Sequence, residues 1–210
     1  MNLNFTLPYI ESTSKSLLET YPFLKSHEDV IKPSGKEHYF FLTSLSNQLN
    51  NANIIELGTH TGRSSLALGF NKTNKLTTYD IVDILLPDVK NANNANITFK
   101  IDNLFDPVIR EQNRNKLLSS DVLFIDIDPH EGVMEFEMYQ WLKENDYQGL
   151  IFFDDIHLKE GHMGVQTGNS MQKTLWDKIE DKYKKDLTHV GHWSGTGLVC
   201  FNFDKYNIII

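Results

Sequence analysis

From residue 53 onward, short apolar runs alternate with amphipathic segments. Five runs of five or six residues have the length of strands that are buried on both faces of a parallel sheet. They lie at residues 53–57, 76–80, 97–101, 122–126 and 149–154. Helical periodicity follows each run, at residues 63–70, 84–89, 107–118, 132–143 and 171–183. This alternation of strand and helix predicts a doubly wound α/β sheet.

The two ends of the chain have a different pattern. Apolar residues at 187–191 and 197–203 flank the segment HWSGT (192–196), which predicts a β-hairpin. Residues 1–50 hold two helical stretches, at 9–24 and 36–49, with a predicted turn at 33–35. The apolar residues 206–210 predict either a paired edge strand or an interface. We therefore expect one domain overall, with an N-terminal helical segment (1–50) and a main part (51–210).

The first predicted strand ends in a glycine-rich turn, ELGTHTGRSS at residues 56–65. Gly58 and Gly62 allow backbone N–H groups and a helix N-terminus to approach a ligand closely. Their spacing fits neither the GxGxxG dinucleotide motif nor the P-loop, which disfavours a nucleotide-dependent oxidoreductase. The pattern ExGxxxGxS resembles the first motif of the class I methyltransferases, which use S-adenosylmethionine (SAM).

All five predicted strands end in acidic residues. These are Glu56, Asp80, Asp102, Asp126 with Asp128, and Asp154 with Asp155. The carboxyl ends of parallel strands meet at one edge of a sheet, where open α/β folds bind their ligands. Clustered carboxylates repel one another, so this edge is expected to bind cationic, hydroxyl-rich or metal ligands.

The resemblance implies how SAM is held at this edge. Asp80 would accept hydrogen bonds from the ribose hydroxyls, and Asp102 or its neighbour Asn103 would contact the adenine amino group. The methionine ammonium would lie beside Glu56 and the turn. The complete set expected at the cofactor is Glu56, Gly58, Thr59, His60, Thr61, Gly62, Ser64, Asp80, Asp102, Asn103 and Asp126.

Two further segments, VLFIDIDPHEGV (122–133) and GLIFFDDIH (149–157), combine aspartates with histidines. Such oxygen-rich clusters suit Mg²⁺. Together with TLWDKI (174–179) and the GTG at 195–197, they resemble the metal-dependent small-molecule O-methyltransferases of the catechol type. The resemblance is closer still to the cephalosporin-hydroxylase and macrolide-sugar methyltransferase group, and it spans residues 50–203.

This resemblance implies a Rossmann-like class I methyltransferase fold. It has a seven-stranded, mostly parallel sheet with a C-terminal antiparallel hairpin, and its N-terminal helices form a lid over cofactor and substrate. The metal ligands would be Asp126, Asp154 and Asp155, with Asp128 as a further candidate. The metal would lower the pKa of an acceptor hydroxyl and align it with the SAM methyl group.

A general base would remove the hydroxyl proton, with His130 as the first candidate and His157 as the second. The chain departs from the family pattern at Pro129, where a histidine is usual, and it has no lysine between Asp126 and Lys143 to act as base. The remaining expectations concern the acceptor side. His162, His189 and His192 are expected at the surface or in loops, and Trp193 and the loop 161–169 are expected near the acceptor.

Composition narrows the partners. The 210 residues carry a net charge of −8, which disfavours non-specific binding to nucleic acid. One cysteine, no leader-like N-terminus and no long apolar run predict a cytoplasmic protein outside the membrane. A small molecule or sugar is the expected acceptor, and a homo-oligomer remains open. Two alternatives also remain, a metal-independent SAM methyltransferase with another acceptor and a non-catalytic SAM-fold binding or scaffold protein.

Overall fold

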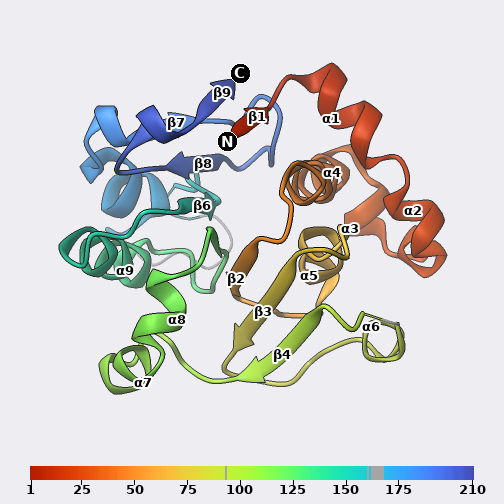
Figure 1. Cartoon of the computed structure of the whole chain (residues 1–210), viewed down its shortest axis with the longest axis horizontal. Coiled ribbons are helices and arrows are strands. Elements are labelled where there is room, and N and C mark those ends of the chain that lie inside the picture. Colours follow the sequence, from red (N-terminus) through yellow and green to blue (C-terminus); the bar gives the residue numbers. More distant parts are fainter. Residues whose placement is uncertain (93, 160, 162–167) are drawn as a thin grey trace.

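The computed structural model describes residues 1–92, 94–159, 161 and 168–210. Its centre is a seven-stranded sheet with the order β4-β3-β2-β5-β6-β8-β7 (Figure 1). Strands β2 to β6 are parallel, and β8 runs antiparallel to both β6 and β7. The strands are β2 (Asn53–Leu57), β3 (Lys75–Asp80), β4 (Ile97–Ile101), β5 (Val122–Ile125), β6 (Leu150–Asp154), β7 (Lys184–Asp186) and β8 (Thr196–Val199). The five predicted parallel strands are confirmed to within one residue.

The central strands are apolar on both sides because helices cover both faces of the sheet. Side chains alternate between the two faces, so neighbouring residues of one strand enter different cores. One core contains Ile54, Phe124 and Phe152 and the other contains Ile55, Ile125 and Phe153. Leu42 and Leu66 bring α4 and α5 to the first core, whereas Leu117 and Met138 bring α8 and α9 to the second.

The α-helices of the described residues are α1 (Leu7–Ser14), α2 (Leu17–Thr20), α3 (Glu28–Ile31), α4 (Pro33–Gln48), α5 (Arg63–Leu68), α6 (Pro87–Asn91), α7 (Pro107–Gln112), α8 (Arg114–Leu118) and α9 (Val133–Glu144). Proline explains two differences from the predicted bounds. Pro33 and Pro87 stand in the first turn of α4 and α6, a position that suits proline because its missing N–H has no helical partner. Residues 33–35 therefore begin a helix, and the predicted turn there is wrong.

Three predicted helices are interrupted. The stretch 9–24 divides into α1, α2 and the turn η1 (Pro22–Ser26). The segment 107–118 divides at Asn113, whose side chain donates a hydrogen bond to the Ile109 carbonyl at 2.9 Å and caps α7. The segment 171–183 is not one α-helix but three short turns, η2 (Met171–Leu175), η3 (Trp176–Lys178) and η4 (Asp181–Tyr183). The buried side chains of Trp176 and Ile179 hold this segment against the second core, and Ile179 itself is extended.

The predicted hairpin is present, but its first strand lies earlier in the chain. Pairing occurs at β7, whereas residues 187–191 form a turn in which Val190 N–H donates to the Leu187 carbonyl at 3.0 Å. Both side chains are buried in the first core, so these residues are apolar because they pack and not because they pair. The turn leads into the segment 192–195, which returns to the end of β6.

The two chain ends form a second, smaller sheet. Strand β1 (Asn2–Asn4) pairs in parallel with β9 (Asn207–Ile209), and Figure 1 shows the N and C termini side by side. The terminal apolar residues thus form a paired strand, as one of the two predictions stated. Short 3₁₀ turns η1 (Pro22–Ser26) and η5 (Phe203–Lys205) complete the fold. Within the described ranges, none of the helices has the length and apolar character needed to cross a bilayer.

Candidate active site

The glycine turn between β2 and α5 is packed tightly against the end of β5. Gly58 has φ +99°, and a Cβ at this position would lie 1.7 Å from the backbone carbonyl oxygen of Asp126. Its N–H donates to the Tyr79 carbonyl at 2.9 Å. Only glycine fits both the left-handed backbone and the close approach. The turn is therefore fixed between the carboxyl ends of β3 and β5.

A cavity of about 240 Å³ lies at the carboxyl ends of β2, β3 and β4. The Asp80 carboxylate lines it and accepts hydrogen bonds from the N–H groups of His60 (2.7 Å) and Ile81 (2.7 Å). Asp102 and Asn103 line the cavity at the end of β4. Asn103 Oδ1 already accepts a hydrogen bond from Phe105 N–H at 3.0 Å, which leaves Asp102 as the more available acceptor. The apolar part of the wall includes Tyr79, Ile81, Ile84, Leu104, Phe105 and Met134.

A second cavity, of about 330 Å³, adjoins the first. Gly58, His60, Asp126 and Asp128 line both cavities. The second one is bounded by α4, the glycine turn, the ends of β5 and β6, and the loop between β7 and β8. One continuous cleft thus runs along the edge of the sheet.

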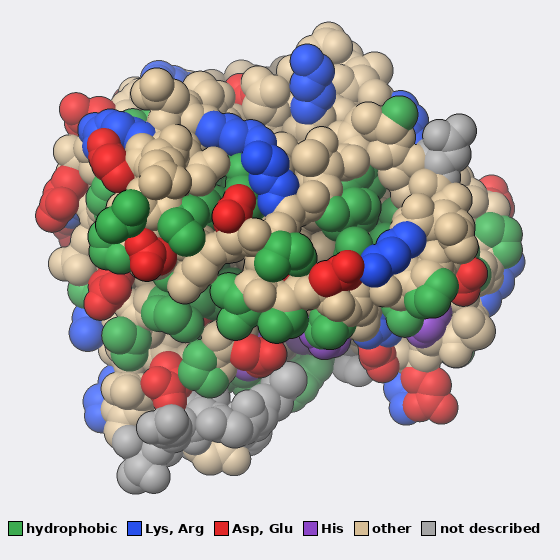
Figure 2. Space-filling view, turned by 90° about the horizontal axis from the view of Figure 1, so that it is seen from below, with side chains coloured by type: hydrophobic (Ala, Val, Ile, Leu, Met, Phe, Trp, Pro, Cys, Tyr) green, Lys and Arg blue, Asp and Glu red, His purple; other side chains and the backbone are tan. Residues whose placement is uncertain are grey.

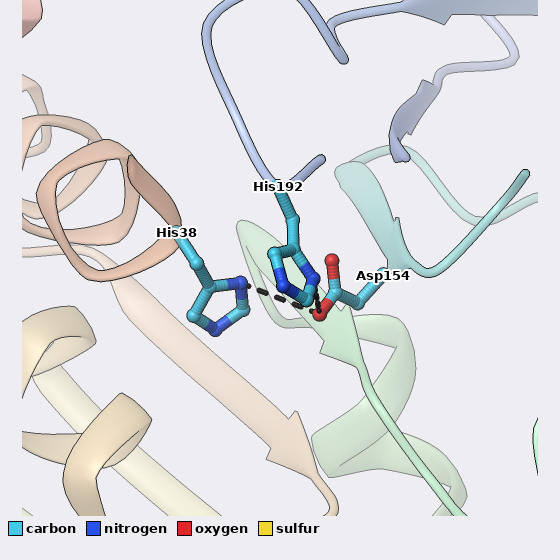
Figure 3. Close-up of side chains that lie close together, drawn as sticks. All are labelled: His38, Asp154 and His192. Atoms are coloured by element: carbon cyan, nitrogen blue, oxygen red, sulfur yellow. Dashed lines mark hydrogen bonds and ion pairs between the residues drawn. The ribbon is translucent and has the colours of Figure 1, made fainter. Parts of the chain in front are cut away.

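Two histidines and an aspartate meet in the second cavity. Figure 3 shows His38 reaching in from α4, His192 from the β7–β8 loop and Asp154 from the end of β6. The Nδ1 atoms of His38 and His192 lie 3.3 Å and 3.2 Å from the same Asp154 oxygen, Oδ2. The other oxygen, Oδ1, is buried and has no hydrogen-bond partner among the described residues. Asp154 is 3% exposed and His38 is 7% exposed.

A second group lies beside the first. His130 Nδ1 lies 3.2 Å from Asp155 Oδ2, and His130 Nε2 lies 3.0 Å from Asp128 Oδ1. The ligand atoms of Asp126, His130 and Asp155 all lie within 4.8 Å of one another. The Ser194 hydroxyl donates to the other Asp155 oxygen. Figure 2 shows a face of the molecule on which histidine side chains lie beside acidic ones.

The charges in these two groups shift one another's pKa values. Burial opposes the charged form of Asp154, but His38 and His192 outweigh it and hold the pKa of Asp154 below its usual value. Burial also opposes protonation of His192, yet Asp154 and Asp155 raise the pKa of that imidazole to about 10. For Asp126, burial comes first and the neighbouring carboxylates add to it, so its pKa lies well above the usual value. The cavity therefore attracts positive charge.

Backbone strain gathers at this cavity. His60, His130 and Asp155 have φ values of +48°, +57° and +62°, in the left-handed region that side chains other than glycine rarely adopt. All three line the second cavity. Such residues persist where the surrounding structure holds them, and they cluster at functional sites.

The structure places most of the expected cofactor and metal residues along the cleft. The residues found there are Gly58, Thr59, His60, Thr61, Ser64, Asp80, Asp102, Asn103, Asp126, Asp128, Asp154 and Asp155. The carboxylates Asp126, Asp154 and Asp155 are divided between the two histidine groups. Gly62 lines neither cavity; it has φ +82° and makes the turn.

Glu56 lies beneath the glycine turn and lines neither cavity. It is fully buried, it accepts a hydrogen bond from the Ser65 hydroxyl, and its Oε1 has no partner among the described residues. Burial raises its pKa, although Ser64, Ser65 and Thr78 partly offset the effect. Its position suits support of the turn rather than direct contact with a ligand.

The two candidate bases are placed differently. His130 lines the second cavity, whereas His157 lines neither and pairs with Asp186 of β7 at 2.7 Å. Trp193 is exposed and also lies outside the residues that line the two cavities. His162 and most of the loop 161–169 fall outside the described residues.

Sequence reasoning missed two residues of the site. His38 lies on a helix whose own pattern gives no sign of a ligand. His192 was expected at the surface or in a loop; it does lie in the β7–β8 loop, but its ring faces Asp154 inside the cavity, and no ligand role was predicted for it. The predicted hairpin could have located it, because Thr196 pairs with Asp154 in the sheet. His189 of the same loop is exposed, as expected.

The sequence matches no protein-family model and no curated protein. Its structure is similar to solved structures over nearly the whole chain. The O-methyltransferase from Bacillus cereus in complex with S-adenosylhomocysteine (SAH) aligns with a TM-score of 0.58 at 20% identity, covering 91% of both chains. A putative caffeoyl-CoA O-methyltransferase from Staphylococcus aureus gives 0.58 at 18% identity, covering 90% of this chain and 94% of the other. The chain has the fold of the class I methyltransferases.

A third structure extends this comparison. The O-methyltransferase TomG from Streptomyces achromogenes, in complex with SAM, aligns with a TM-score of 0.56 at 14% identity, covering 95% of this chain and 97% of the other. At these identities the similarity establishes the class I methyltransferase fold, with its parallel sheet and antiparallel β8. The predicted fold class is confirmed.

Proposed function

We propose that this protein transfers the methyl group of SAM to a hydroxyl group of a small-molecule or sugar acceptor, with the help of a divalent metal. The observation that carries the proposal is the continuous cleft at the strand ends. Its smaller cavity combines carboxylates with an apolar wall, and its larger cavity holds the histidine and aspartate groups. A ligand that spans both would pass Gly58 and Asp126, which line each of them.

The smaller cavity suits the adenosine part of SAM. The Asp80 carboxylate is held by backbone N–H groups: Oδ1 accepts from Ile81 and Val82, whereas Oδ2 accepts from His60 alone and keeps a lone pair for a ribose hydroxyl. Asp102 offers an acceptor for the adenine amino group, and Leu104 and Phe105 belong to the apolar wall that would receive the ring. Bound SAM supplies an electrophilic methyl group.

The larger cavity suits the acceptor. A divalent metal held by its carboxylates and imidazoles would act as a Lewis acid on the acceptor hydroxyl. His130 is the better placed base because it lines this cavity. His130 Nδ1 lies 3.2 Å from an Asp155 oxygen, which favours the tautomer with the hydrogen on Nδ1, and Nε2 would then take the hydroxyl proton. The resulting imidazolium is stabilised at Nε2 by Asp128.

The N-terminal segment supports the predicted lid. His38 and Tyr39 of α4 line the larger cavity, and Asp29 of α3 forms an ion pair with Arg63 at the start of α5. This ion pair joins the N-terminal segment (residues 1–50) to the helix that follows the glycine turn. We extend the proposal accordingly: this segment covers the cleft when substrates are bound. A cytoplasmic location remains part of the same proposal.

Calorimetry with SAH tests the cofactor site without knowledge of the acceptor. We expect one SAH to bind per chain. Methyl transfer from labelled SAM to hydroxyl compounds, beginning with vicinal diphenols and sugars, then tests the activity. Absence of SAH binding at millimolar concentration would refute the proposal.

A further inference from the structure

We propose that His38, Asp154 and His192 bind one divalent transition-metal ion through two imidazole nitrogens and one carboxylate (Figure 3). This set differs from the three carboxylates that the sequence predicted for Mg²⁺. Its use in catalysis rests on the proposed function, whereas the binding of the ion does not.

The spacing of the three side chains suits ligands of one ion. First-row metals bind imidazole nitrogen and carboxylate oxygen at about 2.0–2.2 Å, so neighbouring ligand atoms around one ion lie roughly 3–3.5 Å apart. Asp154 Oδ2 lies 3.3 Å from His38 Nδ1 and 3.2 Å from His192 Nδ1. All three ligand atoms fall within 4.8 Å of one another.

Hydrogen bonds among the described residues do not satisfy every polar atom of this group. His192 Nδ1 has three close oxygens, from Ser194 (2.8 Å), Asp154 (3.2 Å) and Asp155 (3.4 Å), although one ring nitrogen carries at most one hydrogen. Asp154 Oδ1, in contrast, is buried without a partner among those residues. Buried polar atoms are almost always satisfied. An ion that takes the nitrogen lone pairs and both carboxylate oxygens satisfies each of these atoms.

The scaffold holds the three side chains in place from separate elements. His38 packs against Tyr39, Phe124 and His192, with ring centroids 5.1 Å, 5.8 Å and 5.2 Å away. Asp154 ends a strand whose residues are all buried. The three side chains also line the 330 Å³ cavity, so one side of the group faces open space. Three protein ligands with an open position are typical of catalytic metal sites.

The donor types select the metal. Mg²⁺ prefers oxygen ligands in octahedral geometry and keeps several waters, whereas imidazole suits Fe²⁺, Co²⁺, Ni²⁺, Cu²⁺ and Zn²⁺. Two imidazoles with one carboxylate therefore favour a transition metal over Mg²⁺. The competing location is the adjacent group of Asp126, His130 and Asp155, which offers only one imidazole.

Binding of Co²⁺ to the metal-free protein distinguishes the two locations. We expect one Co²⁺ per chain, and we expect His38→Ala and His192→Ala each to weaken binding by roughly tenfold or more. His189→Ala is the matched control, because His189 lies exposed in the same loop as His192, and it should leave Co²⁺ affinity unchanged. Unchanged Co²⁺ affinity in both site variants, or binding that only His130→Ala removes, would overturn the site.

A measurement on the wild-type protein avoids any variant that fails to fold. Pulsed electron paramagnetic resonance of the protein with one equivalent of Cu²⁺ should show coupling to two imidazole nitrogens. Coupling to one imidazole or none would contradict the proposal. SAH binding is measured on the same preparation. If SAH binds but Cu²⁺ shows no coupling to two imidazoles, only this metal site is refuted. If Cu²⁺ shows that coupling but SAH does not bind, the proposed function is refuted.

Discussion

Gly58 and Asp126 touch through their backbones, with room for no side chain between them: a Cβ on Gly58 would lie 1.7 Å from the Asp126 carbonyl oxygen. This contact joins the turn after β2 to the end of β5. Since both residues line both cavities, the contact forms the floor where cofactor and acceptor would meet. The two halves of the cleft therefore meet at this contact, where His60 and Asp128 also line both cavities.

Substitution at this point should disrupt both stability and SAH binding. Gly58→Ala introduces a methyl group into the Asp126 backbone, and we expect it to lower the free energy of unfolding by about 3 kcal/mol and to abolish SAH binding. Gly168→Ala is the control: Gly168 has a similar φ of +95°, but beyond its chain neighbours no atom of the described residues lies within 4 Å of its added Cβ. Chemical denaturation and calorimetry measure the two effects. Equal losses in both variants would show that backbone strain, and not the contact, is responsible.

Replacement of Asp80 should weaken binding of the cofactor. Asp80→Asn replaces one carboxylate oxygen with an NH₂ group, which then faces either the His60 N–H or the N–H groups of Ile81 and Val82, and it removes the negative charge that favours the ribose hydroxyls. We expect SAH affinity to fall by roughly tenfold or more. Asp83→Asn, which loses only an exposed pair with Lys90, is the control and should bind SAH normally. The assignment fails if both variants bind SAH equally well.

Glu135 should make stability depend on pH. Burial in α9 raises its pKa from 4.5 to about 7, so the folded protein retains a proton that the unfolded chain releases. This proton adds to the free energy of unfolding. Its contribution is at most about 3 kcal/mol, is complete below about pH 4.5, and is lost as the pH rises to about 7. Chemical denaturation at pH 5 and pH 8 measures the free energy of unfolding. In Glu135→Gln its decrease between these two pH values, the slope with pH, should be absent. Glu137→Gln, on the exposed side of the same helix, should keep the wild-type slope.

His130 and His157 should differ as general bases. His130 lines the larger cavity, whereas His157 pairs with Asp186 outside it. With a vicinal diphenol as acceptor, we expect His130→Ala to lower the rate of methyl transfer by about 100-fold and His157→Ala to change it by less than about threefold. Initial rates with labelled SAM measure both. The reverse order would move the base to the β7 side of the sheet.

Much of the fold could be predicted because its signals are local. Residues 122–125 and 150–154 are continuous apolar runs, and such runs specify strands that are buried on both faces. The interruption at Asn113 and the irregular turns at Trp176 could not be predicted in the same way. They depend on how side chains distant in the sequence pack around them, and local periodicity does not report that packing.

The residues of the site also differ in whether they could be predicted from local sequence. Asp80, Asp102, Asp126 and Asp154 could be predicted because a parallel sheet places strand ends at one edge. His38 comes from a helix that precedes the sheet, and only the three-dimensional arrangement brings its ring to Asp154. The mixed imidazole and carboxylate set that we propose, in place of the predicted carboxylate set, therefore depends on tertiary structure.

The pairing of β1 with β9 has a consequence for the order in which the chain folds during synthesis. As the chain emerges from the ribosome, β1 has no partner until β9 has been made, and Phe5 and Leu3 lack part of their cover until then. Contacts between such distant residues form late, because the closing of a long loop has a high entropic cost. Helix α4, which carries His38, is thus expected to reach its final position last, after synthesis of the sheet is complete.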